Sequence, residues 1–445
     1  MHGFRGRPRW WSFVALTLAL AGCAPSSAPA ARARPYFDAA LDAATWIRAS
    51  AIETAHGKTW PVDPTKPDEA SLSLYSGSPG VVLFFLDLHR AGHDGALAEA
   101  RAGADHLLVE LPGMTAPGLY SGMAGVGFAL GEAWKATGDE RYRSGLEQAV
   151  TMLRASAVEQ ARGVQWNDVT DIIGGGAGTG LFLLYAGRVL NDSEAIALAA
   201  RAGERLVDLG LAEHGGLKWF MTPEFPRLMP NFSHGTAGIA YFLAGLYQAT
   251  RRQEFLDAAL AGARYLLAVA ETDGDVCLIF HNEPEGLDLH YLSWCHGPAG
   301  TARLFYRLHQ ITGDAEWMTW MRRAARGIVQ SGIPEQQTPG FWNNVSICCG
   351  SAGVADFLVQ MHRLTGDAEY IAFAHRVVQQ MLDRGTRDER GLRWVQAEHR
   401  RQPDLLVAQT GYMQGAAGMG TLLLRMDTLE HPREGLIRLP DDPYP

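Results

Sequence analysis

The chain has 445 residues, of which 47% are apolar and 20% are charged, a globular balance that excludes disorder and collagen-like repeats. The formal net charge is -9, and no basic run occurs beyond the extreme N-terminus. Because phosphate binding needs clustered positive charge, this composition excludes nucleic acid as a main partner.

Residues 1–22 have the features of an export signal. Three arginines precede an apolar stretch over residues 10–20, which is too short to span a bilayer as a mature helix. The following Leu-Ala-Gly-Cys resembles a bacterial lipobox with Cys23 as the lipidated residue, and the Ala-, Pro- and Ser-rich residues 23–34 are expected to form a tether. The sequence thus predicts an exported protein that meets the membrane only through a lipid anchor, on the periplasmic face of the outer membrane in a diderm host. An uncleaved anchor is the alternative.

A short glycine motif, Gly-x-Ala/Pro-Gly, recurs along the rest of the chain at intervals of 45 to 65 residues. Its seven copies lie at 77–80, 122–125, 175–178, 235–238, 297–300, 350–353 and 415–418. Each copy leads into a strongly apolar segment without a polar stripe, which predicts an inner helix that is buried on most sides.

A more charged, amphipathic segment with helical spacing precedes each motif. These segments predict outer helices at about 35–53, 95–111, 139–156, 193–209, 253–270, 314–331 and 367–385. Asp139, Ser193, Asp314 and Asp367 are expected to cap the first free amides of four of them. Where Thr-Gly-Asp occurs, Gly is expected to end an inner helix and Asp to start the next outer one.

The alternation predicts an all-α fold, an (α/α)7 toroid over residues 35–432, with residues 433–445 as a C-terminal tail. In a double ring of seven inner and seven outer helices, each apolar helix is covered and no end is exposed. An open solenoid is the alternative, but solenoids usually have more even repeats and polar caps. The seven motifs would then meet at one end of the bore, where the residues beside them line a common cavity.

Three cysteines stand next to these motifs. Cys295 and Cys348 each lie two residues before the first motif Gly, so they are expected to enter the cavity from neighbouring inner helices, and Cys349 would complete a set of three thiolates. Three soft ligands and an open fourth position suit one catalytic Zn2+ per chain, whereas the alternative is buried, inert cysteines. Cys277 has no motif beside it and is expected to be a core thiol.

Two further junction residues are candidates for acid or base catalysis. His234 directly precedes its motif Gly, as Cys349 does, and Asp171 lies four residues before Gly175, where a helix cap is the alternative role. His296 shares the register of His234; with Trp294 it is a candidate for supporting the metal ligands, and packing at the rim is the alternative.

These motifs, Ser-His-Gly at 233–235, Trp-Cys-His-Gly at 294–297 and Cys-Cys-Gly at 348–350, together resemble the lanthionine synthetase C-like family over residues 35–430. The resemblance implies an α/α toroid with one zinc, which adds a peptide cysteine thiol to dehydroalanine or dehydrobutyrine and closes a thioether ring. By position it implies three zinc ligands and an active-site His and Asp, which fall on Cys295, Cys348, Cys349, His234 and Asp171. Cys349 stands where the family usually has a His.

The expected partner is a peptide or protein that carries dehydroamino acids, with a small thiol as an alternative donor. Two other functions stay open. A non-catalytic zinc- or peptide-binding lipoprotein would use the same cysteines. A glycan-active toroid enzyme would pair Asp171 with Glu224 or Glu283, but it would not need three cysteines at the junctions.

Overall fold

The computed structural model describes residues 1–3, 6, 8, 10, 33–223, 225–433 and 435–445. The chain divides into two units, Met1–Arg34 and Pro35–Pro445. Cys23 and most of the predicted signal and tether fall outside the described residues, so the structure tests neither. Within the described part, each helix is either too short or too polar to cross a membrane.

Inner and outer helices alternate along the second unit. The inner helices are α2 (Ser78–Arg90), α4 (Met123–Thr137), α6 (Gly176–Leu190), α8 (Thr236–Thr250), α10 (Pro298–Thr312), α12 (Ser351–Thr365) and α14 (Ala416–Glu430). The outer helices are α1 (Pro35–Ala49), α3 (Ala96–Glu110), α5 (Glu140–Ser156), α7 (Ser193–Asp208), α9 (Gln253–Val269), α11 (Ala315–Val329) and α13 (Ala368–Asp383). A 3-10 turn, η1 (Leu111–Gly113), follows α3.

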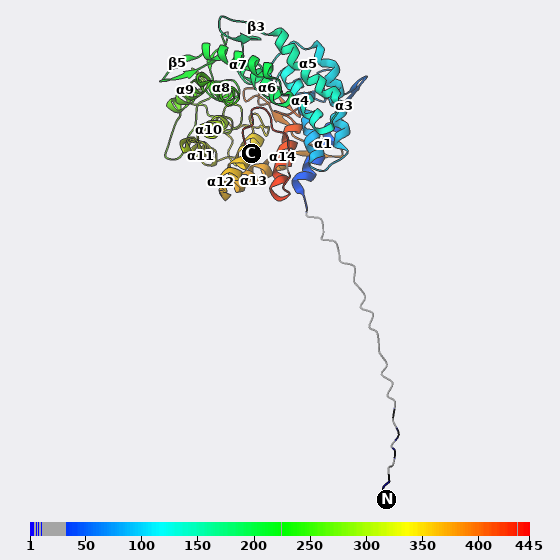
Figure 1. Ribbon diagram of the computed structural model, residues 1–445. Helices are drawn as coiled ribbons and strands as arrows, with labels where there is room; N and C mark the ends of the chain where they lie inside the picture. Colours follow the sequence, from blue (N-terminus) through cyan, green and yellow to red (C-terminus); the bar gives the residue numbers. More distant parts are fainter. Residues whose placement is uncertain (4–5, 7, 9, 11–32, 224, 434) are drawn as a thin grey trace. The chain divides into compact units, whose positions relative to one another are not determined.

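The helices close into a ring. Each inner helix from α2 to α12 packs against the outer helix that follows it, and α14 packs against α1. The inner helices also contact one another in order, and α14 returns to α2 (Figure 1). The predicted (α/α)7 toroid is therefore confirmed, and the open solenoid is excluded.

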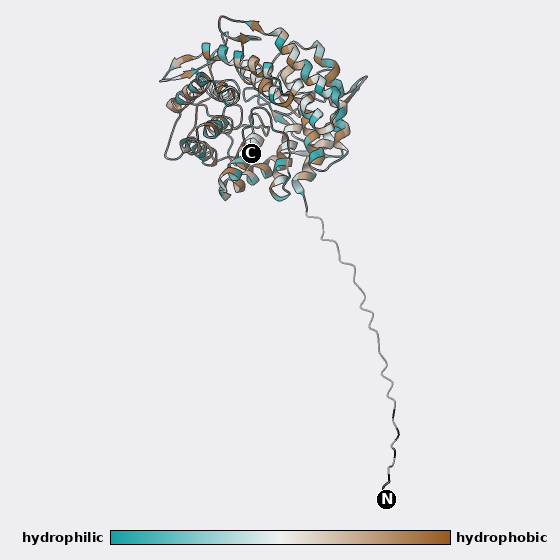
Figure 2. Ribbon diagram, in the orientation of Figure 1, coloured by the Kyte–Doolittle hydropathy of each residue, from teal (hydrophilic) through white to brown (hydrophobic). Residues whose placement is uncertain are grey.

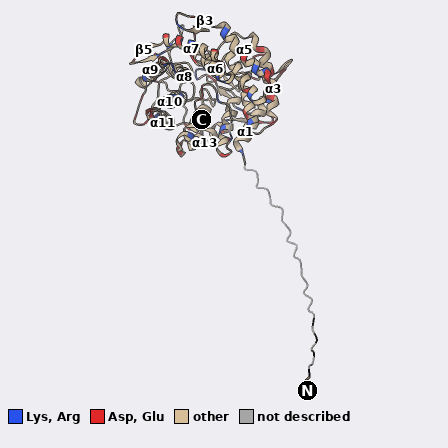
Figure 3. Cartoon of the chain, in the orientation of Figure 1, with Lys and Arg blue, Asp and Glu red and all other residues tan. Residues whose placement is uncertain are grey.

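The burial of the two rings follows their sequences. In α8 the first eleven residues are all buried, as expected for a helix that is covered on every side. In α11 only one face is buried, formed by Met321, Ala324, Ala325, Gly327 and Ile328. Hydrophilic and hydrophobic residues alternate along the outer helices in Figure 2, and charges of both signs are spread over the outside in Figure 3.

The helix ends bear out most of the predicted caps. Asp139, Asp314 and Asp367 accept hydrogen bonds from the backbone amide two residues on. The glycine before each of them is left-handed, with φ between 66° and 72°. For α7 the cap is Asp192 rather than Ser193, because the Asp192 carboxylate accepts from the next two free amides.

Short antiparallel hairpins lie on the loops that follow outer helices. In the described chain they are β1 (Ile52–Thr54) with β2 (Gly57–Thr59), β3 (Val158–Glu159) with β4 (Val164–Gln165), β5 (Leu211–Glu213) with β6 (Gly216–Lys218), β7 (Phe220–Thr222) with β8 (Phe225–Leu228), β9 (Thr386–Asp388) with β10 (Gly391–Arg393), and β11 (Gln396–Ala397) with β12 (Leu406–Val407). Four of them end in a tryptophan whose indole donates to a carbonyl in the last turn of the preceding outer helix: Trp60, Trp166, Trp219 and Trp394. These tryptophans anchor the loops.

The C-terminal residues 435–445 lie inside the ring (Figure 1). Asp441 is fully buried, and its carboxylate accepts hydrogen bonds from Tyr120 Oη, Trp294 Nε1 and Arg303 Nη1. Tyr444 is also buried. The segment that sequence reasoning set apart as a tail is therefore part of the toroid interior, where it enters between the C-terminal ends of the inner helices.

Candidate active site

The seven junctions that precede the inner helices are joined by a closed ring of backbone hydrogen bonds. At six of the seven junctions the residue that takes part lies two places before the first motif Gly. Its amide donates to one neighbouring junction, and its carbonyl accepts from the other. At the third junction Ile173 accepts and Ile172 donates. The residues involved are Tyr75, Tyr120, Ile172, Ile173, Ser233, Cys295, Cys348 and Met413, with N···O distances of 2.8 to 3.3 Å.

The motif glycines allow this ring to form because they let backbone segments approach closely. A Cβ atom on Gly350 would collide with the carbonyl of Asn344, and one on Gly353 would collide with the carbonyl of Ile347. Gly350 has a φ of -123°, which any residue adopts, so the requirement is space and not an unusual backbone angle.

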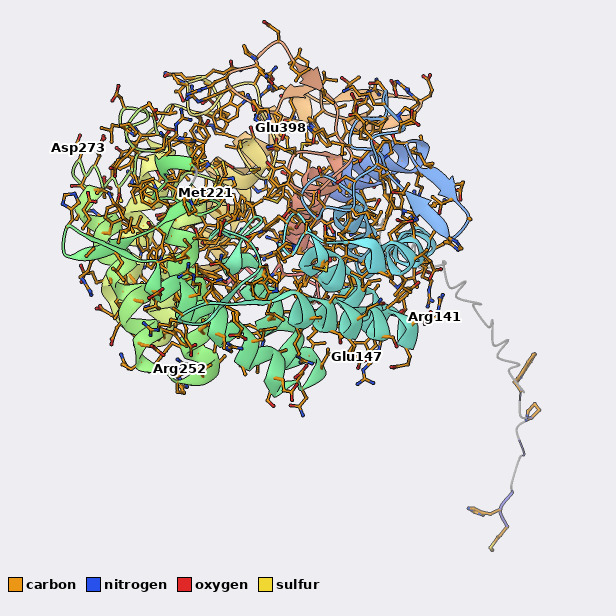
Figure 4. The ribbon with its side chains drawn as sticks, turned by 90° about the horizontal axis from the view of Figure 1, so that it is seen from above. Arg141, Glu147, Met221, Arg252, Asp273 and Glu398 are labelled. Atoms are coloured by element: carbon orange, nitrogen blue, oxygen red, sulfur yellow. The ribbon has the colours of Figure 1, made fainter. Side chains whose placement is uncertain are left out.

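The ring places residues of equal register side by side at one end of the bore. Cys295 and Cys348 are direct neighbours, since the Cys295 amide donates to the Cys348 carbonyl at 2.9 Å. Figure 4, turned by 90° from Figure 1, labels Glu398 toward one end of the toroid and Arg252 toward the other. Met221 belongs to the loop that borders the third junction, because its carbonyl accepts from the Thr170 amide.

Three sulfur atoms form a cluster there. The Sγ atoms of Cys295, Cys348 and Cys349 all lie within 4.8 Å of one another. Cys349 Sγ is 3.2 Å from that of Cys295 and 3.5 Å from that of Cys348. Cys295 and Cys348 are buried, whereas Cys349 is partly exposed, so the cluster is accessible from the Cys349 side.

This cluster fits a soft divalent metal. Sulfur ligands at about 2.3 Å in a tetrahedron lie roughly 3.8 Å apart, and the observed separations need only a small opening to reach that value. Burial opposes ionisation of all three thiols, but hydrogen bonds from Cys295, Cys349 and Tyr75 hold the pKa of Cys348 well below its ordinary value. Burial and the neighbouring sulfurs raise the pKa of Cys295. A cation is what would allow all three to ionise together.

Two side chains that sequence reasoning missed also contact the sulfurs. Tyr75 Oη donates to Cys348 Sγ at 3.2 Å, and Gln414 Nε2 lies 3.7 Å from Cys349 Sγ. The signal that could have found them is the repeat register, because Tyr75 is equivalent to Cys348 and Gln414 is equivalent to Cys349.

His234 and Asp171 form a hydrogen-bonded pair beside the cluster. Nδ1 of His234 lies 2.5 Å from Asp171 Oδ2, and Oδ1 of Asp171 accepts from the amides of Gly174 and Gly175. The Asp171 side chain is 2% exposed and that of His234 is 32% exposed. Burial alone would lower the pKa of His234, but the hydrogen bond and charge of Asp171, helped by the charge of Cys348, raise it above 6.5.

The two candidate supporting residues occupy different places. The ring of His296 stacks on that of His234 with centroids 5.6 Å apart, and burial lowers its pKa well below 6.5. His296 therefore stands beside His234 as a neutral imidazole. Trp294 instead faces the bore, where its indole donates to Asp441 Oδ2 at 3.1 Å. It therefore supports the ring of junctions from the side of the C-terminal segment.

The remaining candidates lie elsewhere. Cys277 is buried, and burial raises its pKa to about 11, as expected of a core thiol outside the cluster. Glu283 accepts from Tyr265 Oη at 2.8 Å. Glu224, the other partner proposed for a glycan-active site, is outside the described residues. Tyr291 lies near the cluster, with its ring tilted against that of Trp342 at a centroid distance of 5.1 Å; burial raises its pKa, and the charges of Cys349 and Cys295 add to this effect.

The chain is similar to several known proteins. A family model described as lanthionine synthetase C-like protein matches residues 68–434. Among solved structures, nisin cyclase matches with a TM-score of 0.59 and 17% identity, covering 81% of this chain and 89% of that chain. The Lin0763 protein from Listeria innocua matches with a TM-score of 0.52 and 12% identity, covering 90% of this chain and 99% of that chain. At these identities the solved structures support the ring fold alone.

Proposed function

Because the chain belongs to the lanthionine synthetase C-like family, we propose that it is a zinc-dependent enzyme that adds a thiol to a dehydroalanine or dehydrobutyrine residue of a peptide. The observation that carries this proposal is the meeting of three cysteine sulfurs within 4.8 Å, at the end of the bore that also holds the His234–Asp171 pair. A glycan-active enzyme would have no use for the sulfurs.

Each group at the site has a role in this reaction. Cys295, Cys348 and Cys349 would hold one zinc, which when bound supplies a positive charge that keeps a fourth, substrate thiol ionised near neutral pH. A free thiol is mostly protonated there, since its pKa is about 8.5. The chain thus prepares the nucleophile, and the partly exposed Cys349 marks the side from which the substrate arrives.

The His234–Asp171 pair supplies the proton that the reaction needs. When the thiolate attacks the β-carbon, a carbon–sulfur bond forms and the electron pair of the double bond moves toward the α-carbon and the adjacent carbonyl. Asp171 binds Nδ1 of His234, which leaves Nε2 for the reacting group. His234 then gives its Nε2 proton to the α-carbon and recovers one from the substrate thiol through solvent.

The metal is tested first. The chain is purified under reducing conditions without added zinc, beside a Cys348→Ala/Cys349→Ala variant and a Cys277→Ala control. We expect one zinc per chain in the wild type and in the control, and none in the double variant. A well-folded wild type without zinc would overturn the proposed chemistry.

The reaction is tested with a short peptide that contains one cysteine and one dehydroalanine. Ring closure does not change the mass of such a peptide, so the loss of free thiol is measured by alkylation and mass spectrometry. A second reaction supplies glutathione to a dehydroalanine peptide without cysteine, which separates ring closure from addition of a small thiol. Bound zinc without either reaction would favour the non-catalytic binding function.

We further propose that the protein is exported and lipid-anchored at Cys23. The basic and apolar N-terminus with its Leu-Ala-Gly-Cys sequence supports this location. The test compares the full chain with a Cys23→Ser variant in a bacterial host that is fed a labelled fatty acid. Equal labelling of the two proteins would contradict the anchor.

A further inference from the structure

Two polar side chains that take no part in the proposed reaction direct their donors at the sulfur cluster. Tyr75 Oη donates to Cys348 Sγ at 3.2 Å, and Gln414 Nε2 donates to Tyr75 Oη at 3.0 Å and lies 3.7 Å from Cys349 Sγ. Asn344 Nδ2 donates to Gln414 Oε1 at 3.0 Å, which fixes the amide with its NH2 group toward the sulfurs.

These donors reach the cluster because the ring closes there. Tyr75 precedes α2 at the first junction and Gln414 precedes α14 at the seventh, and the two helices pack against each other. The Met413 amide donates to the Tyr75 carbonyl, and the Cys348 amide donates to the Met413 carbonyl. The two ends of the repeat array therefore meet beside Cys348 and Cys349.

The two donors can stabilise the net negative charge that a three-thiolate metal site would carry. Three thiolates around a divalent ion leave one net negative charge, whereas two thiolates and a neutral imidazole leave none. A buried negative charge is stabilised by hydrogen bonds aimed at it, and bonds to an ionised acceptor are the strong ones. Tyr75 and Gln414 stand next to the two adjacent cysteines, one of which contributes the third thiolate.

We propose that Tyr75 and Gln414 are positioning residues that stabilise the additional negative charge of a three-thiolate zinc site. This inference rests on the proposed zinc site. The same ring offers a matched control in Tyr120, which has the register of Tyr75 but donates its hydroxyl to Asp441 Oδ1 at 3.1 Å instead of to sulfur.

The experiment compares Tyr75→Phe with Tyr120→Phe in protein loaded with Co2+, whose absorption reports electron donation from sulfur. Loss of a hydrogen bond leaves the Cys348 thiolate more electron-rich, so the sulfur-to-cobalt band of Tyr75→Phe is expected at longer wavelength. Its affinity for zinc, measured against a competing chelator, is expected to fall about tenfold. Tyr120→Phe should change neither quantity.

The outcomes separate this inference from the one on which it rests. A wild type that binds no cobalt would refute the zinc site itself. Cobalt binding with identical spectra and affinities in wild type and Tyr75→Phe would overturn the role of Tyr75, as would an equal change in Tyr120→Phe. If Tyr75→Phe does not fold by circular dichroism, Gln414→Leu carries the same test, because it removes the donor to Tyr75 and Cys349.

Discussion

The two ends of the bore are built in different ways, although the same seven inner helices reach both. At the junction end one backbone arrangement is repeated around the ring, and the chemistry comes from which side chain occupies each register. At the opposite end the non-repeated residues 435–445 lie inside the ring (Figure 1). There, a network of buried ion pairs joins different elements: Arg303 pairs with Asp441, Arg425 pairs with Asp442, and Asp356 lies near both arginines.

The residues proposed for the reaction and the residues expected to stabilise the fold therefore lie at opposite ends of the bore. Between the C-terminal segment and the junction ring the bore retains a cavity of about 20 Å3, room for roughly one water molecule. Under the proposed function, a substrate would reach the sulfur cluster from the junction end, where Cys349 is partly exposed. Changes at that end are expected to affect the reaction, and changes at the other end are expected to affect the free energy of unfolding.

The largest expected effect is on the reaction, from His234→Ala. Loss of the proton donor should slow thiol addition about 10²- to 10⁴-fold, or about 3–5 kcal/mol, while zinc content and thermal stability stay close to those of the wild type. Asp171→Asn should cause a smaller loss. The neutral amide no longer stabilises the positive charge on His234, but Nε2 of His234 keeps its place. Rates from the alkylation assay, with metal content measured in parallel, check both. An unchanged rate in His234→Ala would remove it from the mechanism.

The next effect is on stability, from Asp441→Ala at the opposite end. This change removes the carboxylate that accepts from Arg303, Tyr120 and Trp294, and it leaves the buried guanidinium with only the more distant Asp356 at 3.8 Å, which is expected to destabilise the fold by about 3–5 kcal/mol. The control is Glu335→Ala, which breaks the exposed ion pair with Arg376 and should change stability by less than about 1 kcal/mol. Denaturant unfolding of both variants decides the point. Equal stabilities would show that the C-terminal segment does not hold the ring.

The repeat register is what makes the site predictable from the sequence. It brings Cys295, Cys348 and Cys349 together because equal positions in a closed ring become neighbours. The same register holds Tyr75 and Gln414, but it does not show that they contact the sulfurs, because the first and seventh junctions become neighbours only when the ring closes.

The C-terminal segment is harder to predict for another reason. It has no repeat, and Asp441 and Asp442 are of a type that is usually exposed. The available signal lies in their partners, because Arg303 and Arg425 each stand between apolar neighbours within a predicted inner helix. A buried arginine needs an acid, but the sequence alone does not say which one.

A third prediction concerns pH and again separates the two ends. Asp87 accepts from the Ile437 amide of the C-terminal segment, and burial raises its pKa from 3.8 to about 7. Between these values the folded state binds more protons than the unfolded state, so this residue lowers stability as pH rises from about 4 to 7. Asp87→Asn does not titrate. Between pH 5 and pH 7 the free energy of unfolding should therefore fall less in Asp87→Asn than in the wild type. The difference between the two falls should be at most about 2 kcal/mol.

Denaturant unfolding at the two pH values tests this, with zinc content measured at each because the sulfur cluster also binds protons. The same pH slope in both proteins would mean that Asp87 is ionised throughout the range. Thiol addition by Asp87→Asn at a single pH should match the wild type, since Asp87 lies at the end of the bore away from the sulfurs.

The smallest expected effect comes from Cys349→His at the junction end, which replaces the third thiolate by a neutral ligand. A less electron-rich site draws more charge from the bound substrate thiolate and makes it a weaker nucleophile, so thiol addition should slow by less than tenfold, or under about 1.4 kcal/mol. Gln414 Nε2, 3.7 Å from Cys349 Sγ, would also lose an anionic neighbour. Rates are compared at one zinc per chain. A variant that adds thiols faster with the same products would show that the third thiolate does not make the bound substrate thiolate more nucleophilic.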